Sequence, residues 1–175
     1  MGKKPIDDVT FLDEAAQSLI AAVRDRLSRL DDVDAALVHV LTDVAVFIGA
    51  EAASIFLVDR TSGDLVLRYA IEAVGQKIVG LRLKPGQGVV GWVIKHGEDL
   101  IVPFPGMDAR FFNGVDQSTG FATRSILCGP IRLEGRTIGA LEVLNKRQGT
   151  FNDDDLVLLR AICCLVADVV STTGW

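Results

Sequence analysis

Residues 104–155 read FPGMDARFFNGVDQSTGFATRSILCGPIRLEGRTIGALEVLNKRQGTFNDDD, and this stretch decides the fold. It begins within an irregular loop of about twenty residues, 103–123, and continues into two expected strands at 124–133 and 136–144 joined by Glu134-Gly135. Long loops without secondary structure are uncommon in compact domains and usually carry function. We therefore expect residues 103–123 to form a lid or a binding loop.

Segments outside this stretch alternate between helical and strand patterns. Apolar residues recur at three- and four-residue steps over 11–30, with Thr10 as the expected N-cap, and again over 33–48 ahead of Gly49. Further strands are expected at 53–58, 65–70, 77–83 and 100–102, and further helices at 89–96 and 153–171, the last with Asn152 as N-cap. Hairpin-linked strands between terminal helices predict an α+β fold. We expect a six-stranded antiparallel sheet with the N- and C-terminal helices on one face and a loop-covered pocket on the other.

Composition favours one globular domain and excludes several functional classes. The chain has 175 residues, of which 49% are hydrophobic and 23% are charged, and this is enough for a well-formed core. Its net charge of −5 argues against a nucleic-acid partner, and its apolar runs are too short to span a membrane. The three cysteines make no disulfide framework, so we expect a cytoplasmic protein with buried thiols.

Gly86-Gln87-Gly88-Val89-Val90-Gly91 matches the G-x-G-x-x-G pattern of dinucleotide-binding sites. That pattern belongs to a βαβ unit of about thirty residues, whereas the next expected strand here begins only about ten residues later. We interpret the glycines as a turn that starts a short helix. We find neither a nucleophile–base set nor a metal-ligand spacing, and we predict a protein that is not an enzyme and has no metal or cofactor.

The sequence Asn145-Lys146, followed by Phe151 and Asp155, resembles the NKFDE signature of GAF domains, although Leu156 replaces the final Glu. Such domains occur in cyclic-nucleotide phosphodiesterases, adenylyl cyclases and bacterial sensor proteins. The resemblance implies a structural lock in which Lys146 pairs with an aspartate beside the pocket. It divides the chain into an N-terminal signalling or dimerisation helix at 1–32, a GAF domain at 33–171 and a tail at 172–175.

The same resemblance implies a set of pocket residues. Matched to a cyclic-GMP-binding GAF domain, Ser54 falls where a serine faces the base, and Thr119 and Thr123 fall where threonines face the ligand. The Phe-Asp pair that holds the purine in that family is replaced by Ala70 and Ile71, which disfavours a cyclic nucleotide as ligand. The predicted ligand-binding residues are Ser54, Ala70, Ile71, Val89, Val90, Thr119, Thr123 and Glu142.

Glu142 is the one charged residue among these, and it alternates with Ala140 and Leu144 on one face of an expected central strand. A buried carboxylate is costly unless it is paired. Two interpretations remain open at this point. Glu142 either has a structural explanation, as a pair with a nearby arginine such as Arg124 or as a side chain partly exposed at the sheet edge, or it is a pocket acceptor for a donor group of the ligand.

We therefore predict a regulatory domain that senses a small molecule and transmits its occupancy through the terminal helices, 12–30 and 156–171, of a homodimer. One alternative is a ligand-free dimerisation module whose vestigial pocket is filled by Ile71, Val89, Phe111 and Phe112. A second is a GAF-fold free methionine sulfoxide reductase. The second is disfavoured because Cys128, Cys163 and Cys164 share no pocket loop.

Overall fold

Six strands form one antiparallel sheet in the computed structural model, which describes residues 9–29 and 32–173. Parts of the predicted segments 1–32 and 172–175 therefore lie outside the described residues. The strands are β1 (Ala50–Val58), β2 (Leu65–Ala70), β3 (Arg82–Leu83), β4 (Leu100–Val102), β5 (Ile126–Leu133) and β6 (Arg136–Lys146). Their spatial order is β3-β2-β1-β6-β5-β4, and every neighbouring pair is antiparallel. The predicted α+β class and six-stranded sheet are confirmed.

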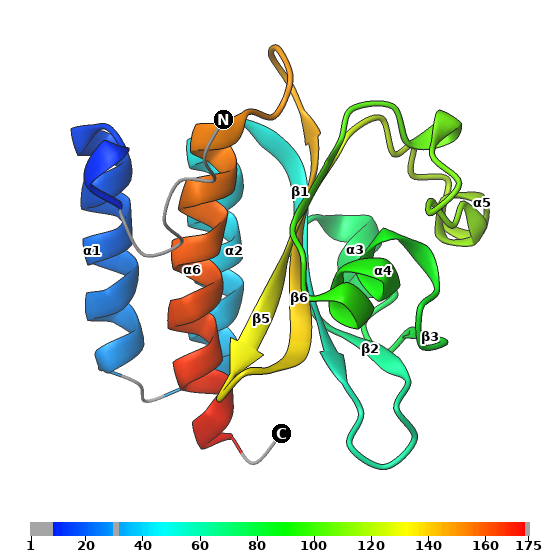
Figure 1. Cartoon of the computed structure of the whole chain (residues 1–175), viewed down its shortest axis with the longest axis horizontal. Coiled ribbons are helices and arrows are strands. Elements are labelled where there is room, and N and C mark those ends of the chain that lie inside the picture. The colour runs from blue at the N-terminus through cyan, green and yellow to red at the C-terminus, as the bar shows by residue number, and fades with distance from the viewer. Residues whose placement is uncertain (1–8, 30–31, 174–175) are drawn as a thin grey trace.

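Helices cover both faces of the sheet (Figure 1). The helices on one face are α1 (Glu14–Ser28), α2 (Val33–Ile48) and α6 (Asp153–Thr172). The shorter helices α3 (Ala73–Lys77), α4 (Gly88–His96) and α5 (Gly114–Thr119) lie on the other. Two short 3₁₀ turns, η1 (Val9–Phe11) and η2 (Pro105–Met107), complete the described elements.

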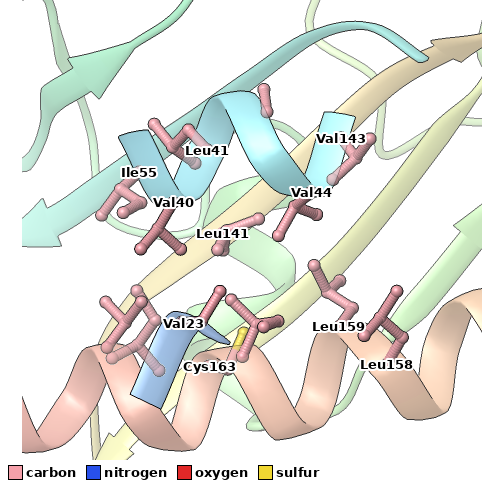
Figure 2. Packing of buried hydrophobic residues seen from close by; sticks show 14 of the residues in the cluster. Val23, Val40, Leu41, Val44, Ile55, Leu141, Val143, Leu158, Leu159 and Cys163 are labelled. Carbon is pink, nitrogen blue, oxygen red and sulfur yellow. The ribbon is translucent and has the colours of Figure 1, made fainter. Parts of the chain in front are cut away.

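The sheet separates two apolar cores because successive side chains of a strand face opposite sides. Leu141 and Val143 of β6 face the long helices, whereas Ala140 faces the short ones. Figure 2 shows Val44 of α2 and Cys163 of α6 gathered with Leu141 in the helix-side core. One core therefore lies between the sheet and the long helices. The other lies between the sheet and the short helices, and the pocket opens on that face.

The long helices begin and end where capping residues stand. Asp32 Oδ1 accepts a hydrogen bond from Ala35 N at 3.0 Å at the start of α2, and Gly49 ends that helix in the left-handed conformation. Asn152 caps α6, as predicted, in a reciprocal capping box with Asp155. The predicted N-cap Thr10 is wrong: Asp13 caps α1 by accepting from Ala16 N at 2.8 Å.

Two segments fold differently from their sequence predictions. The expected strand 77–83 is reduced to Arg82–Leu83. Its first residue belongs to α3, which Glu72 caps by accepting from Gly75 N with Oε1 at 2.5 Å. Gly80 then turns the chain with a φ of 95°. The expected irregular loop 103–123 contains η2 and α5, each of only one or two turns. Among the described residues, no helix is both long and apolar enough to cross a membrane.

Candidate functional site

A row of four side chains crosses the centre of the sheet on its short-helix face. In the strand register Ala70 of β2 pairs with Ser54 of β1, Ser54 with Glu142 of β6, and Glu142 with Cys128 of β5. Of these four residues, Ser54 and Glu142 bring the polar side chains into an otherwise apolar sheet face. Ala70, Ser54 and Glu142 form the floor of the candidate site, whereas Cys128 lies in the apolar core beside it.

A cavity of about 110 Å³ lies above this floor. Its volume is smaller than the roughly 300–1,000 Å³ typical of drug-sized sites. All eight predicted ligand-binding residues line it, so the structure brings the whole set together, while their role in binding stays a prediction. The cavity stays open even though Ile71, Val89, Phe111 and Phe112 form part of its wall.

Glu142 is held by Ser54, whose Oγ donates to Glu142 Oε1 at 3.0 Å. The alternative pair with Arg124 is wrong, because Arg124 instead pairs with Glu51 on the outer end of β1. The pKa of the Glu142 carboxyl is raised to about 7, mainly because the group is buried. The Ser54 hydrogen bond lowers this pKa, and the nearby charge of Asp116 raises it. The pocket floor thus carries a carboxyl group that titrates near neutral pH.

Asp116 is a site residue that the sequence did not reveal. It lies on α5, lines the cavity and accepts from Thr123 N and Thr123 Oγ1, both at 2.7 Å. Thr119 Oγ1 donates to Val115 O at 2.8 Å and accepts from Phe121 N at 3.2 Å. Thr119 and Thr123 therefore line the cavity, and their hydroxyl groups also make hydrogen bonds within the lid.

The first half of the lid is anchored on α4. Arg110 donates to Asp108 Oδ2 at 2.6 Å, and its guanidinium lies 5.1 Å from the Trp92 ring centroid. Trp92 in turn stacks on His96 with ring centroids 4.1 Å apart. These contacts fix residues 108–110 against the helix that supplies Val89 and Val90.

The C-terminal end of the lid is fixed by Asn145, which is 1% exposed and has a φ of 60°. Its side-chain oxygen accepts from Arg124 N at 2.6 Å and from Ser125 N at 3.3 Å. Its amide nitrogen donates to Glu51 Oε2 and to Ala122 O, both at 2.9 Å. One amide side chain therefore joins the end of the lid to strands β1 and β6.

The adjacent Lys146 connects the same strand end to α6. Its Nζ lies 2.5 Å from Asp155 Oδ2, and the two side chains are only 16% and 13% exposed. Phe151 is buried, with Lys146 Nζ 6.0 Å from its ring centroid. The predicted pairing of Lys146 with an aspartate is confirmed, and it places the four residues Asn145, Lys146, Phe151 and Asp155 at the junction of lid, sheet and α6.

The glycine motif builds the α4 wall of the cavity. A Cβ on Gly91 would lie 2.5 Å from the carbonyl carbon of Gly86, so α4 packs directly on the preceding turn. Gln87 provides no side-chain cap to α4, because its Oε1 instead accepts from Lys84 N at 2.8 Å. The start of α4 therefore has no side-chain cap, and its first three residues, Gly88, Val89 and Val90, line the cavity.

The three thiols differ in exposure. Cys128 and Cys163 are buried as predicted, and burial raises the pKa of both thiols. Cys164 is exposed on α6, contrary to the prediction. Within residues 9–29 and 32–173 there is no group of three or more His, Cys, Asp or Glu placed to hold a metal ion.

Comparison with known sequences identifies this arrangement. The GAF domain profile matches residues 32–170. The chain belongs to the GAF domain family. It is 30% identical over 162 residues to a probable 3',5'-cyclic phosphodiesterase, pde-5, of Caenorhabditis elegans, an alignment that covers 85% of the chain and 22% of that protein. The GAF domain described here thus spans about a fifth of the length of this relative.

Solved structures agree on the fold. A GAF domain from a phosphoenolpyruvate-protein phosphotransferase of Coxiella burnetii superposes with a TM-score of 0.83 at 20% identity, covering 91% of this chain and 94% of that one. A free methionine-R-sulfoxide reductase from Neisseria meningitidis, in complex with its substrate, gives a TM-score of 0.77 at 19% identity, with 93% of each chain covered. At these identities the likeness concerns the fold alone.

Proposed function

We propose that this GAF domain is a regulatory module that binds a small molecule in the cavity above Glu142 and transmits its occupancy to the terminal helices. The observation that carries the proposal is the unfilled cavity, which is lined by Ser54 and Glu142 from the sheet and by residues 111–123 of the lid. A purely structural module has no need of a cavity with a polar floor beneath a short lid.

The contacts of Asn145 and Lys146 support a route for transmission. Asn145 binds the lid end at Ala122, Arg124 and Ser125, while Lys146 binds Asp155 in the first turn of α6. A ligand that shifts the lid would act on two neighbouring residues that also hold the start of α6. We include in the proposal a homodimer, a cytoplasmic location and a regulatory rather than catalytic role.

A cyclic nucleotide remains disfavoured as the ligand. The relative from Caenorhabditis elegans is described as a cyclic phosphodiesterase, but the positions that hold a purine by stacking and by a carboxylate are Ala70 and Ile71 here. Each missing contact removes about 1–3 kcal/mol, or together roughly 30- to 20,000-fold in affinity. Isothermal titration with cyclic AMP and cyclic GMP is expected to give dissociation constants above about 1 μM.

Two alternatives have less support. The scaffold alternative requires a filled pocket, whereas the cavity is open. The reductase alternative requires a reactive thiolate, whereas burial raises the pKa of both Cys128 and Cys163 and so suppresses the nucleophilic form. A thiol-dependent assay with free methionine sulfoxide tests this alternative directly, and turnover would contradict the regulatory proposal.

The sensing proposal is tested by native mass spectrometry and hydrogen exchange on the same preparation. Freshly purified protein is expected to carry a non-covalent small molecule that is lost after unfolding and refolding. Loaded and stripped protein are then compared for amide exchange in residues 122–125 and in α6. Slower exchange in both segments of the loaded protein supports transmission, whereas identical exchange in α6 contradicts it.

A further inference from the structure

The polar groups around the cavity are of two kinds, and they come from different elements. The acidic groups come from the sheet floor, the lid and the β2–α3 turn: Glu142, Asp116 and Glu72. Among the described residues that line the cavity, none is Lys, Arg or His. The second kind is the backbone N–H groups of the uncapped start of α4, whose first three residues, Gly88, Val89 and Val90, line the cavity.

These acidic groups differ in how far they are already engaged. Glu72 Oε1 accepts from Gly75 N in the cap of α3, and both Asp116 oxygens accept from Thr123. In Glu142, Oε1 accepts from Ser54, while Oε2 accepts no hydrogen bond from any part of the chain that the structure describes. Glu142 is therefore the strongest candidate to accept from a ligand donor, with Asp116 close enough to raise its pKa.

The start of α4 has the opposite preference. A helix N-terminus carries roughly half a positive elementary charge and presents amide donors that favour anionic groups. That partial charge is smaller than the charge of the carboxylates, so it cannot make the whole cavity an anion site. It does provide a separate place for one acceptor group on the ligand.

We propose that the cavity selects a small zwitterion with an apolar body, whose ammonium group binds Glu142 and Asp116 and whose carboxylate binds the amide groups at the start of α4. This inference rests on the proposed sensing function and specifies its ligand class. The remaining walls are apolar, including Leu67, Ile71 and Phe111, and they suit an aliphatic side chain. The cavity volume of about 110 Å³ also suits a molecule smaller than a nucleotide.

Three probes with the same aliphatic body separate the contributions of the ammonium group and the carboxylate group to binding. L-leucine carries both groups, 3-methylbutylammonium lacks the carboxylate, and 4-methylpentanoate lacks the ammonium. Binding is measured by titrating ¹⁵N-labelled protein and following the amide signals of Ser54, Val89 and Glu142. L-leucine is expected to bind about ten-fold or more tightly than either single-charge probe, because each charged group makes charge-assisted hydrogen bonds.

Variants assign the ammonium site. Glu142→Gln is expected to weaken L-leucine about ten-fold or more, to the level of 4-methylpentanoate, and to leave 4-methylpentanoate itself unweakened. Asp116→Asn is the second variant and is expected to weaken L-leucine in the same direction. Glu98→Gln makes the same charge change at an exposed residue outside the cavity wall and is the matched control. The amide spectrum reports whether each variant is folded.

Several results would overturn the inference. One is L-leucine binding no tighter than the better single-charge probe, and another is L-leucine affinity that is the same in wild type and in Glu142→Gln. If cyclic AMP or cyclic GMP shifts the pocket amides while L-leucine does not, the zwitterion is wrong but sensing stands. If neither the probes nor the nucleotides shift them and no molecule co-purifies, the sensing function fails as well.

Discussion

At the scale of single residues, Glu142 is expected to make the stability of the protein depend on pH. Its pKa is raised to about 7 in the folded protein, against about 4.3 in an unfolded chain. Below the unfolded value both states are protonated, and the folded state carries no penalty. As the pH rises from about 4.3 to about 7, the unfolded state releases its proton first, so stability falls by an amount on the order of 3 kcal/mol.

We predict that Glu142→Gln removes this loss of stability. The difference in unfolding free energy between the variant and wild type is expected to grow across pH 4.5–7 and to level off above it. Urea denaturation at several pH values measures this difference, with Glu98→Gln as the exposed control. A variant-minus-wild-type difference that is flat with pH would show that folding does not raise the pKa of the Glu142 carboxyl.

Mutation of Lys146 measures how much its pair with Asp155 contributes to the free energy of unfolding. Its pair with Asp155 is only 16% and 13% exposed, and removing one partner of a buried pair costs about 3 kcal/mol or more. We predict that Lys146→Ala lowers the unfolding free energy by about 3 kcal/mol. Arg29→Ala, which removes an i,i+4 pair with Asp25 whose side chains are 75% and 57% exposed, is expected to cost less than about 0.5 kcal/mol. Equal effects in the two variants would contradict this prediction.

The residues that the sequence revealed are those governed by strand alternation or matched by the family resemblance. Glu142 alternates with Ala140 and Leu144, so its face of the strand could be predicted from the sequence pattern. Ser54 lies in the continuous apolar run 53–58 and was predicted from the resemblance to GAF domains. Asp116 could not be predicted in this way, because its role depends on the hydrogen bonds that Thr123 makes across the lid turn. The pairing of Arg124 with Glu51 instead of Glu142 likewise depends on where the lid returns to the sheet.

At the scale of elements, α4 depends on the glycine on which it packs. A Cβ on Gly91 would meet the backbone of Gly86 at 2.5 Å, and backbone cannot move aside as a side chain can. We predict that Gly91→Ala costs about 1–3 kcal/mol through overpacking and displaces the wall that carries Val89 and Val90. Gly106→Ala, at a position with open space around it, is the matched control. Thermal unfolding of both variants measures the difference, and an unchanged melting temperature in Gly91→Ala would refute the packing argument.

Element prediction from sequence succeeded for long, regular segments and failed for single turns. The helices α2 and α6 have caps and several turns of apolar periodicity, so the sequence indicated them clearly. In contrast, α3 and α5 span five and six residues, too short for a periodic pattern. Their ends are set by local bonds, such as Glu72 to Gly75 N and Thr119 to Val115 O.

At the scale of the whole molecule, the apolar faces of the terminal helices are already used within one chain. Ile20 and Val23 of α1 pack in the same core as Cys163 and Val166 of α6. These apolar side chains of α1 and α6 are therefore buried within one chain. The larger exposed apolar side chains on the helix layer include Val46 and Phe47 of α2, which are 75% and 40% exposed.

We predict a homodimer that uses this part of α2. Wild type is expected to be dimeric at tens of micromolar, a concentration at which weak dimers form. Val46→Glu is expected to make the protein monomeric without unfolding it, because Val46 is exposed. Val79→Glu, at a residue 49% exposed outside the helix layer, is the control. Light scattering on all three proteins measures the mass, and monomeric wild type or dimeric Val46→Glu would contradict the prediction.

The alternation of β6 also limits how the chain can change in length. Leu141 and Val143 belong to the helix-side core, whereas Glu142, which lies between them in the sequence, belongs to the pocket floor. Inserting a single residue after Ala140 would shift the register and turn the carboxylate toward the long helices. The hairpin tip at Glu134-Gly135 faces no such restriction, since both residues are exposed. Insertions and deletions in this protein's descendants are therefore expected at the tips of its hairpins and to be purged from its central strands.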